Sequence, residues 1–315
     1  MPTGKFGSLT LSGTGTKTVG TNEVMVKGNL TIGNGITLKG SSNNGSCIIV
    51  KGDLDIQGTQ GDVAQDNRIE IAFQGGKKHQ LNTVGDLSLY RLTLNDEDTM
   101  EINSANPVNL IAGSQKGGGV RLGNNALLNV SNKALQLTGA AAFNAENNTG
   151  RIAINGGNMN FDISTASDSH LYFDADSNIV EKFEVNLTGA GDVVLEEELN
   201  LIAELNLTNG DLNANGRLVL RSDENGTAVI KELPTGAQIN GNIQAERFMS
   251  ATRAYRYTSA PVTGVTVADW QNYFPITGNF TGASTGPGLG TSASLYRFDE
   301  SQGGWLAHPV SGTDN

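Results

Sequence analysis

A short sequence that recurs at a fixed interval constrains the fold more than any other feature of the chain. Residues 26–32 read Val-Lys-Gly-Asn-Leu-Thr-Ile and residues 50–56 read Val-Lys-Gly-Asp-Leu-Asp-Ile, so five of the seven positions are identical. The two heptads are 24 residues apart, and the same offset relates Leu137 to Phe161. A fixed period of this size indicates stacked structural units, each of which is too small to bury its apolar side alone.

Within each unit, apolar and polar residues alternate. Leu30 and Ile32 fall on one side of an extended chain, and Asn29 and Thr31 fall on the other. Alternation with period two is typical of a strand that is buried on one face. Similar patterns predict short strands at residues 92–94, 135–137, 152–154, 171–173, 193–195 and 205–207.

Short strands and a coil-length repeat together predict an all-β fold, a parallel β-helix with about 24 residues per coil over residues 1–236. The prediction requires Leu30 to lie directly against Leu54 on the next coil. We expect right-handed coils, because parallel crossovers are nearly always right-handed. An antiparallel β-sandwich explains the alternation equally well, but it gives no reason for the fixed offset between the two heptads.

The composition fits a narrow core with frequent turns. Among 315 residues there are 41 glycines, and only 6% of residues are aromatic. Asn often lies beside Gly, as in Gly33-Asn34-Gly35, and such pairs favour turns with positive φ. Disorder is the alternative interpretation of a Gly- and Asn-rich chain, but the regular spacing of Val, Ile and Leu disfavours it.

The character of the chain changes after about residue 236. Aromatic residues and Pro become frequent, and we expect residues 237–315 to form a small, aromatic-rich and β-rich C-terminal region. Residues 266–269 predict the cap of a short helix that runs through residues 270–274. Residues 278–294 are rich in Gly, Thr and Ser and are expected to form a loop. The sequence ends without a closing element, so we expect this region to be truncated.

The net charge of −11 disfavours binding to nucleic acid through its phosphates and docking on anionic lipid. No apolar run is long enough to span a membrane. The first residues contain no apolar stretch typical of a signal peptide, and we interpret the chain as a segment of a longer protein. The lone Cys47 lies in an apolar run, which favours a buried small residue over a reactive thiol.

Two stretches resemble a known group of proteins. The opening, Phe6-Gly7-Ser8-Leu9-Thr10-Leu11-Ser12-Gly13-Thr14-Gly15-Thr16-Lys17-Thr18, resembles repeats in large exported surface proteins of Bacteroidota. Residues 241–262, with Gly241-Asn242-Ile243-Gln244-Ala245-Glu246-Arg247-Phe248 and Arg253-Ala254-Tyr255-Arg256-Tyr257-Thr258-Ser259-Ala260-Pro261-Val262, resemble the segment that follows such repeats. The resemblance implies an adhesin-like or surface-layer role, an extracellular or cell-surface location, and contact with the type IX secretion machinery through a sorting domain that this sequence does not contain.

One short motif resembles a calcium loop. Asp174, Asp176 and Asn178 follow the Asp-x-Asp-x-Asn spacing in which side-chain oxygens hold the ion. The sixth position is Ile179 instead of Gly, and the twelfth is Val185 instead of Glu. These three residues are the metal candidates, and no other cofactor is expected.

Aromatic residues in the C-terminal region offer a candidate glycan site. Tyr255, Trp270 and Tyr273, together with Tyr257, could stack against sugar rings. The alternative is that they form the core of a small β domain.

No arrangement of residues predicts catalysis. The acidic runs at residues 95–98 and 196–198 are interpreted as solvated turns, and Arg121, Arg151 and Arg217 as isolated cations. The sequence therefore favours a non-catalytic structural or adhesive module, with a surface glycan or a neighbouring surface protein as partner. The alternatives are a carbohydrate-active β-helix, acting as a polysaccharide lyase or a glycoside hydrolase, and a glycan-binding module.

Overall fold

The computed structural model describes residues 4–20, 23–40, 46–57, 69–85, 87–104, 109–112, 118–250, 255–260 and 262–309. The chain divides into two compact units, a solenoid unit (Met1–Ser250) and a C-terminal unit (Ala251–Asn315). Parallel strand pairing continues to Ala245, beyond the expected boundary at residue 236, because Ile243 and Ala245 still pack against the apolar column of the preceding turns.

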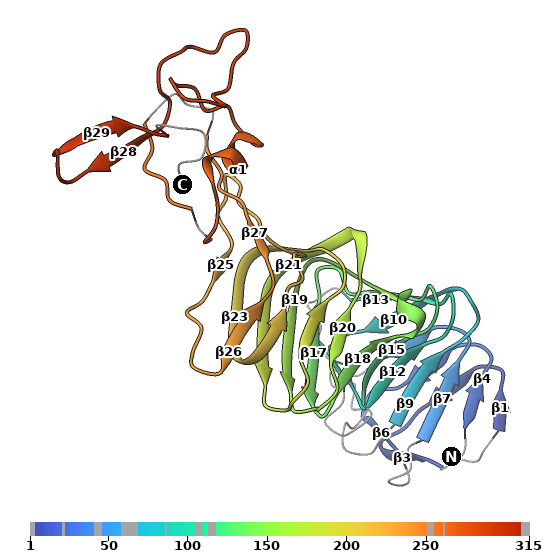
Figure 1. Cartoon of the computed structure of the whole chain (residues 1–315). Coiled ribbons are helices and arrows are strands. Elements are labelled where there is room, and N and C mark those ends of the chain that lie inside the picture. Colours follow the sequence, from blue (N-terminus) through green and yellow to red (C-terminus); the bar gives the residue numbers. More distant parts are fainter. Residues whose placement is uncertain are drawn as a thin grey trace. The chain divides into compact units, whose positions relative to one another are not determined.

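The solenoid unit is a parallel β-helix, as the repeat predicts (Figure 1). Its described residues form about nine turns, and strands from successive turns lie side by side. The first stack contains β1 (Gly4–Phe6), β4 (Val24–Val26), β7 (Ser46–Val50), β9 (Ile69–Phe73), β12 (Arg91–Leu94), β15 (Gly119–Leu122) and β18 (Ala142–Ala145). This series is continued by β20 (Ser169–Leu171), β22 (Val193–Leu195), the end of β23 and β26 (Ala237–Asn240).

Two further stacks complete each turn. The second contains β2 (Leu9–Leu11), β5 (Leu30–Ile32), β8 (Leu54–Ile56), β10 (Lys78–Thr83), β13 (Thr99–Asn103), β16 (Leu127–Asn129), the beginnings of β19 (Arg151–Ile163), β21 (Phe173–Leu187) and β23 (Leu199–Asn213), and then β24 (Leu218–Leu220) and β27 (Ile243–Ala245). The third contains β3 (Gly15–Val19), β6 (Ile36–Gly40), β11 (Leu87–Leu89), β14 (Asn109–Ala112), β17 (Ala134–Gly139), later parts of β19, β21 and β23, and β25 (Val229–Ile230).

The register of the strands confirms the repeat. Leu30 pairs with Leu54, and Leu137 pairs with Phe161, each at the offset that relates the two heptads. Other turns differ in length, because the connections between strands absorb extra residues: Arg91 pairs with Gly119, which lies further along the chain than one repeat. The predicted strands lie within observed strands, except that the one at residues 171–173 is divided at Tyr172, between β20 and β21.

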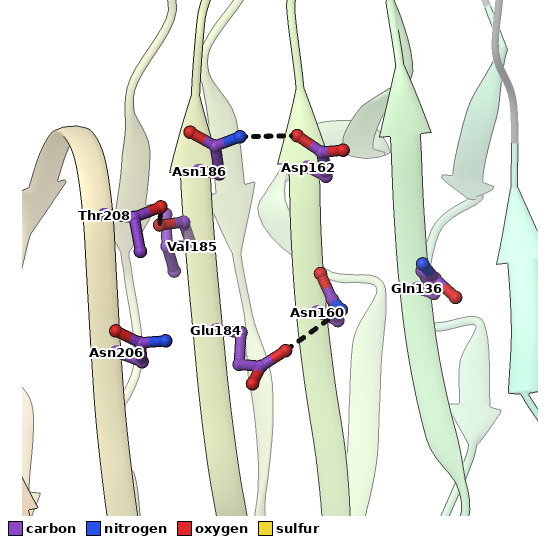
Figure 2. A pocket seen from close by; sticks show the side chains of 8 residues that line it. All are labelled: Gln136, Asn160, Asp162, Glu184, Val185, Asn186, Asn206 and Thr208. Carbon is purple, nitrogen blue, oxygen red and sulfur yellow. Dashed lines mark hydrogen bonds between the residues drawn. The ribbon is translucent and has the colours of Figure 1, made fainter.

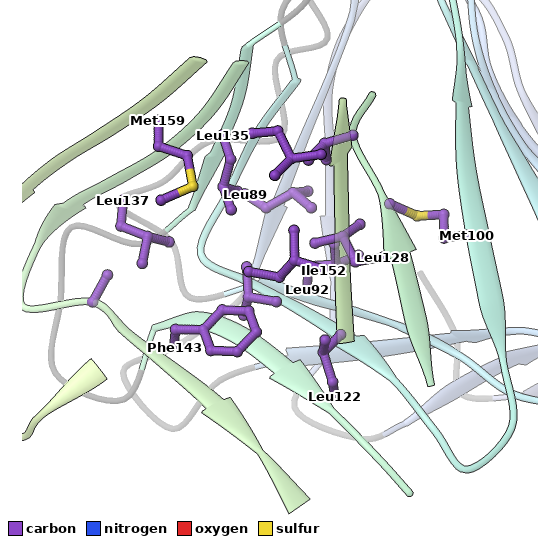
Figure 3. Packing of buried hydrophobic residues seen from close by; sticks show 14 of the residues in the cluster. Leu89, Leu92, Met100, Leu122, Leu128, Leu135, Leu137, Phe143, Ile152 and Met159 are labelled. Atoms are coloured by element: carbon purple, nitrogen blue, oxygen red, sulfur yellow. The ribbon is translucent and has the colours of Figure 1, made fainter. Parts of the chain in front are cut away.

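One column of apolar side chains fills the interior of the solenoid unit. In the first stack the buried residues Val24, Ile48, Ile71, Leu92, Val120 and Phe143 follow one another from turn to turn. Figure 3 shows part of this packing, in which side chains from different strands meet across the interior. Burial of each such side chain contributes about 1.5–3 kcal/mol, so the column is the main source of stability.

Tight turns join the strands at positions that Asn and Gly occupy. Asn215 and Gly216 both adopt positive φ, at 51° and 75°. This backbone conformation is strained for most side chains but accessible to Asn and Gly, which explains why the pair recurs along the sequence. The break in the repeat after residue 57 falls partly outside the described residues; its described part contains a turn at Gly75 and Gly76 before β10.

The C-terminal unit contains little regular structure. The helix α1 (Val267–Gln271) begins at the cap Thr266, whose hydroxyl accepts a bond from the N–H of Asp269, while the Asp269 carboxylate bonds back to the cap. The cap agrees with the prediction, but the helix ends before residue 274. The strands β28 (Tyr296–Asp299) and β29 (Gly304–Ala307) form an antiparallel hairpin, and residues 278–294 form a loop as expected.

Candidate functional site

A polar groove of about 270 Å³ lies on the outer side of four neighbouring strands, β17, β19, β21 and β23. It is lined by Gln136, Asn160, Asp162, Glu184, Val185, Asn186, Asn206 and Thr208. Because successive side chains of a strand point to opposite faces, its polar residues alternate with buried residues of the core, such as Phe161 and Phe183. The rings of these two residues pack edge to face in the core beneath these strands, with their centroids 5.5 Å apart.

Two hydrogen bonds between turns fix the side chains of the groove (Figure 2). Asn160 Nδ2 donates to Glu184 Oε2 at 3.1 Å, and Asn186 Nδ2 donates to Asp162 Oδ1 at 2.7 Å. Each bond crosses between β19 and β21, and the two run in opposite directions. Both carboxylates are therefore held by a neutral amide donor from the adjacent turn.

The strand register changes inside the groove. Val185 pairs with Leu207 but Asn186 pairs with Asn209, so Thr208 is an extra residue at a β-bulge. The Thr208 hydroxyl donates to the carbonyl of Val185 at 3.3 Å, and Asn209 Nδ2 donates to the carbonyl of Leu187. A bulge redirects a side chain while leaving the rest of the strand in place. The groove was not predicted, because its signal in the sequence is only the pairing of polar positions that are one coil apart.

The three calcium candidates are on β21, in a part of the strand that bulges between turns. Ile152 pairs with Phe173 but Ile154 pairs with Asn178, so the chain between these points contains extra residues. Asp176 N donates to Asp174 Oδ1 at 3.2 Å. Asn178, in contrast, is buried and hydrogen-bonded to the next turn. Its Nδ2 donates to the Glu198 carbonyl, and its Oδ1 accepts from Nδ2 of Asn200.

The oxygen of Asn178 that the calcium motif would use is therefore already a hydrogen-bond acceptor. Within the described residues, no group of three or more His, Cys, Asp or Glu side chains is placed to hold a metal ion. The calcium site remains a prediction, and the Asp174 carboxylate likewise already accepts a bond, from the backbone of Asp176.

The aromatic candidates of the C-terminal unit have different surroundings. Tyr255 and Tyr273 are strongly exposed, at 95% and 77%, whereas Trp270 is half-buried and packs against Phe274 at 6.1 Å. Among the described residues no ring contact joins Tyr255, Tyr273 and Trp270. The rings of these three residues therefore do not pack on one another.

A second aromatic group lies on the hairpin of the C-terminal unit. Phe298 and Trp305 are partners across the two strands, with ring centroids 5.3 Å apart, and Tyr257 packs against Trp305 at 5.7 Å. Phe298 and Trp305 are each about half exposed. The hairpin was not predicted from the sequence, so the proximity of these three aromatic residues was not predicted either.

The acidic run at residues 196–198 forms ion pairs with neighbouring turns instead of a free turn. His170 Nδ1 lies 2.7 Å from Glu196 Oε1. Arg151 and Arg217 lie 3.4 Å and 3.6 Å from the carboxylate of Glu197. The interpretation of these two arginines as isolated is wrong, because the coil brings them from different turns to the same carboxylate.

The interpretation of residues 95–98 as a solvated turn is also wrong for Asp98. Its side chain is fully buried, and its Oδ1 accepts from Lys77 N and lies 3.1 Å from His79 Nε2. His79 is equally buried, and its Nδ1 lies 2.6 Å from the carbonyl of Gly52. The sequence did not predict the contact between His79 and Asp98, because the two residues belong to different turns. The apolar residues Leu81 and Met100 that lie near them in the sequence gave no sign of it.

Cys47 is half-buried on the outer side of β7, in contrast to the expected full burial. Burial is the main factor that raises the pKa of its thiol to about 12, and the carboxylates of Glu70 and Glu23 raise it further. Glu70 is its partner on the next turn. The thiol is accordingly a poor nucleophile, as the sequence suggested, but its partial exposure follows from strand alternation.

No protein-family model matches the chain, and neither the curated proteins nor the solved structures contain a match. No helix among the described residues has both the length and the apolar character needed to cross a membrane.

Proposed function

We propose that this chain is a non-catalytic structural and adhesive module of an exported bacterial cell-surface protein. The observation that carries the proposal is the apolar column, in which turn after turn is held by the same kind of contact, as at Leu30 and Leu54. Solenoids of this type build extended surfaces whose outer side chains vary without loss of the fold. Such a scaffold suits a spacer or a binding surface.

The arrangement of charge supports a scaffold over a reactive site. Glu197 pairs with Arg151 and Arg217, and Glu196 contacts His170, so these carboxylates are engaged by side chains of other turns. The buried pair of Asp98 and His79 lies in the interior. A catalytic carboxylate, in contrast, needs access to substrate and a pKa suited to proton transfer.

The location is tested on intact cells of the organism that encodes the chain. Antibody raised against the solenoid unit should label unpermeabilised cells, and external protease should remove the label while a cytoplasmic marker persists. Labelling that requires permeabilisation would contradict the surface location. The resemblance to exported repeat proteins motivates this experiment.

The non-catalytic role is tested with purified chain and a panel of neutral and acidic polysaccharides, with calcium and with chelator. We expect no new reducing ends and no unsaturated products. Release of either product in proportion to protein would identify a hydrolase or a lyase and would overturn this part of the proposal.

A further inference from the structure

We infer that the polar groove on β17, β19, β21 and β23 binds a short neutral oligosaccharide. This inference rests on the proposed adhesive function and names its ligand class. Four parallel strands about 4.8 Å apart give the groove a length of about 14 Å along the solenoid, which suits a few sugar rings. Its contacts are hydrogen-bonding groups that repeat from one turn to the next.

Four polar groups of the groove are held in position by hydrogen bonds to one another. Asn160 is bonded to Glu184 and Asn186 is bonded to Asp162, so four side chains are restrained before a ligand arrives. Ordering a side chain during binding costs about 0.5–1.5 kcal/mol in general, and a groove that is already ordered avoids much of that cost. Carboxylates and amides together also supply both acceptors and donors, which sugar hydroxyl groups require.

The bulge at Thr208 also lies in the groove. A regular parallel ladder would continue without an extra residue, but here Thr208 interrupts the register and lines the groove. Bulges are frequent beside functional sites because they re-aim individual side chains. The bulge is independent of the amide–carboxylate bonds, yet it occurs at the same place.

The charge of the groove indicates the ligand class. The lining includes two carboxylates, Asp162 and Glu184, and no cationic side chain, and the chain carries a net charge of −11. Anionic glycans and nucleic acids are therefore disfavoured by charge. The apolar lining residue Val185 is buried, so the groove lacks the aromatic or aliphatic anchors on which protein partners usually depend. Neutral polyhydroxyl compounds are the remaining match.

The test measures binding of the full chain to neutral hexasaccharides of glucose, xylose and mannose by calorimetry, with hexagalacturonate and heparin as acidic comparisons and with EDTA present. We expect at least one neutral hexasaccharide to bind. The double variant Asn160→Ala, Asn186→Ala should weaken that binding about tenfold or more, since it removes two donors and releases both carboxylates.

A matched control is available on another stack, where Asn103 Nδ2 donates to Asn82 Oδ1 at 3.0 Å. The variant Asn103→Ala removes a similar exposed bond outside the groove and should leave binding unchanged. A second groove variant, Glu184→Gln, preserves the shape of the side chain and should also weaken binding. Unchanged thermal unfolding of all variants shows that the fold is intact.

Three results would overturn the inference. The first is absence of binding to every neutral hexasaccharide at millimolar concentration. The second is binding that persists in the groove variants and is lost in Tyr273→Ala, which would place the site in the C-terminal unit. The third is binding of the acidic probes alone. A chain that is exposed on the cell surface and binds none of the probes would lose this inference but keep its proposed structural role.

Discussion

Asn29 Oδ1 accepts a hydrogen bond from the backbone N–H of Asp53, one turn further along the chain, at 3.0 Å. The same arrangement occurs on both sides of this pair: Ser8 Oγ accepts from Asn29 N at 3.2 Å, and Asp53 Oδ1 accepts from Gln80 N at 2.9 Å. Each corner residue thus binds the backbone of the next turn. The fourth position of the sequence repeat is Asn or Asp because it needs a short side chain with an acceptor oxygen.

Replacement of Asp53 should destabilise the solenoid unit measurably. Asp53→Ala leaves Gln80 N without its side-chain acceptor, and loss of such a bond costs about 1 kcal/mol. Tm should fall by about 2–4 °C in calorimetry, given the size of the unit. Asp53→Asn retains an acceptor and should restore most of the loss. Asp55→Ala is the control, since Asp55 accepts only an exposed bond from the Gln57 side chain among the described contacts; an equal loss of stability in this control would contradict the corner role.

Glycine at the preceding position should be more sensitive to substitution. A Cβ on Gly52 would lie 2.5 Å from the carbonyl oxygen of Gly28 and would also clash with Asn29 Oδ1. Gly52→Ala should therefore force adjacent turns apart, at a cost of about 1–3 kcal/mol, and this loss can be measured by urea unfolding.

The first described turn supplies a matched control for this substitution. Gly7 occupies the equivalent position, and a Cβ there would meet no atom within 4 Å. Gly7→Ala should leave the midpoint of unfolding almost unchanged. If the two variants unfolded at the same urea concentration, the close stacking of Gly52 on Gly28 would not be what selects glycine at this position.

These two corner positions show how far the sequence determines the fold. The repeat and its alternation predicted the parallel stacking and the pairing of Leu30 with Leu54, because apolar side chains separated by one turn share a single interior. The roles of Gly52 and Asp53 were not predicted, although both belong to the repeated heptad. Gly52 and Asp53 are required because each contacts an adjacent turn, and the residues in contact can be identified only when the register of the turns is known.

The groove was beyond sequence analysis for a similar reason. Asn160 and Glu184 occupy paired positions on adjacent turns, but Asn, Asp and Glu occur at many outward positions of this chain. The bulge at Thr208 lies beside this pair, and a one-residue change of register leaves no clear mark in the sequence. The expected glycan residues Tyr255 and Tyr273 were selected by residue type alone, and the structure leaves both side chains exposed.

The buried pair of His79 and Asp98 should be strongly coupled. Asp98→Ala removes the partner of His79 Nε2 and the acceptor of Lys77 N in a site that water does not reach. Leaving a buried hydrogen-bonding group without its partner typically costs about 1–3 kcal/mol. We expect Asp98→Ala to lower the free energy of unfolding by an amount of this order in urea titrations.

A double-mutant cycle separates the pair from the rest of the core. Together, His79→Leu and Asp98→Ala should cost less than the sum of their separate effects, because the double variant leaves neither a buried imidazole nor a buried carboxyl without the other. Additive losses would show that the two side chains do not interact energetically. Asp98→Asn is a useful third variant, since it keeps an acceptor for Lys77 N but removes the negative charge.

Cys47 should react slowly despite its partial exposure. Burial, followed by the carboxylates of Glu70 and Glu23, raises the thiol pKa from 9.0 to about 12, which lowers the thiolate fraction at pH 8 by about a thousandfold. Alkylation by iodoacetamide, followed by mass spectrometry, should therefore be much slower in the native chain than in guanidinium chloride. Because the unfolded thiol ionises near pH 9 and the folded one only near pH 12, this group lowers stability as the pH rises between these values, and the loss should be absent in Cys47→Ala. Equal alkylation rates in the native and denatured chain would show that the outer side of β7 does not shield the thiol.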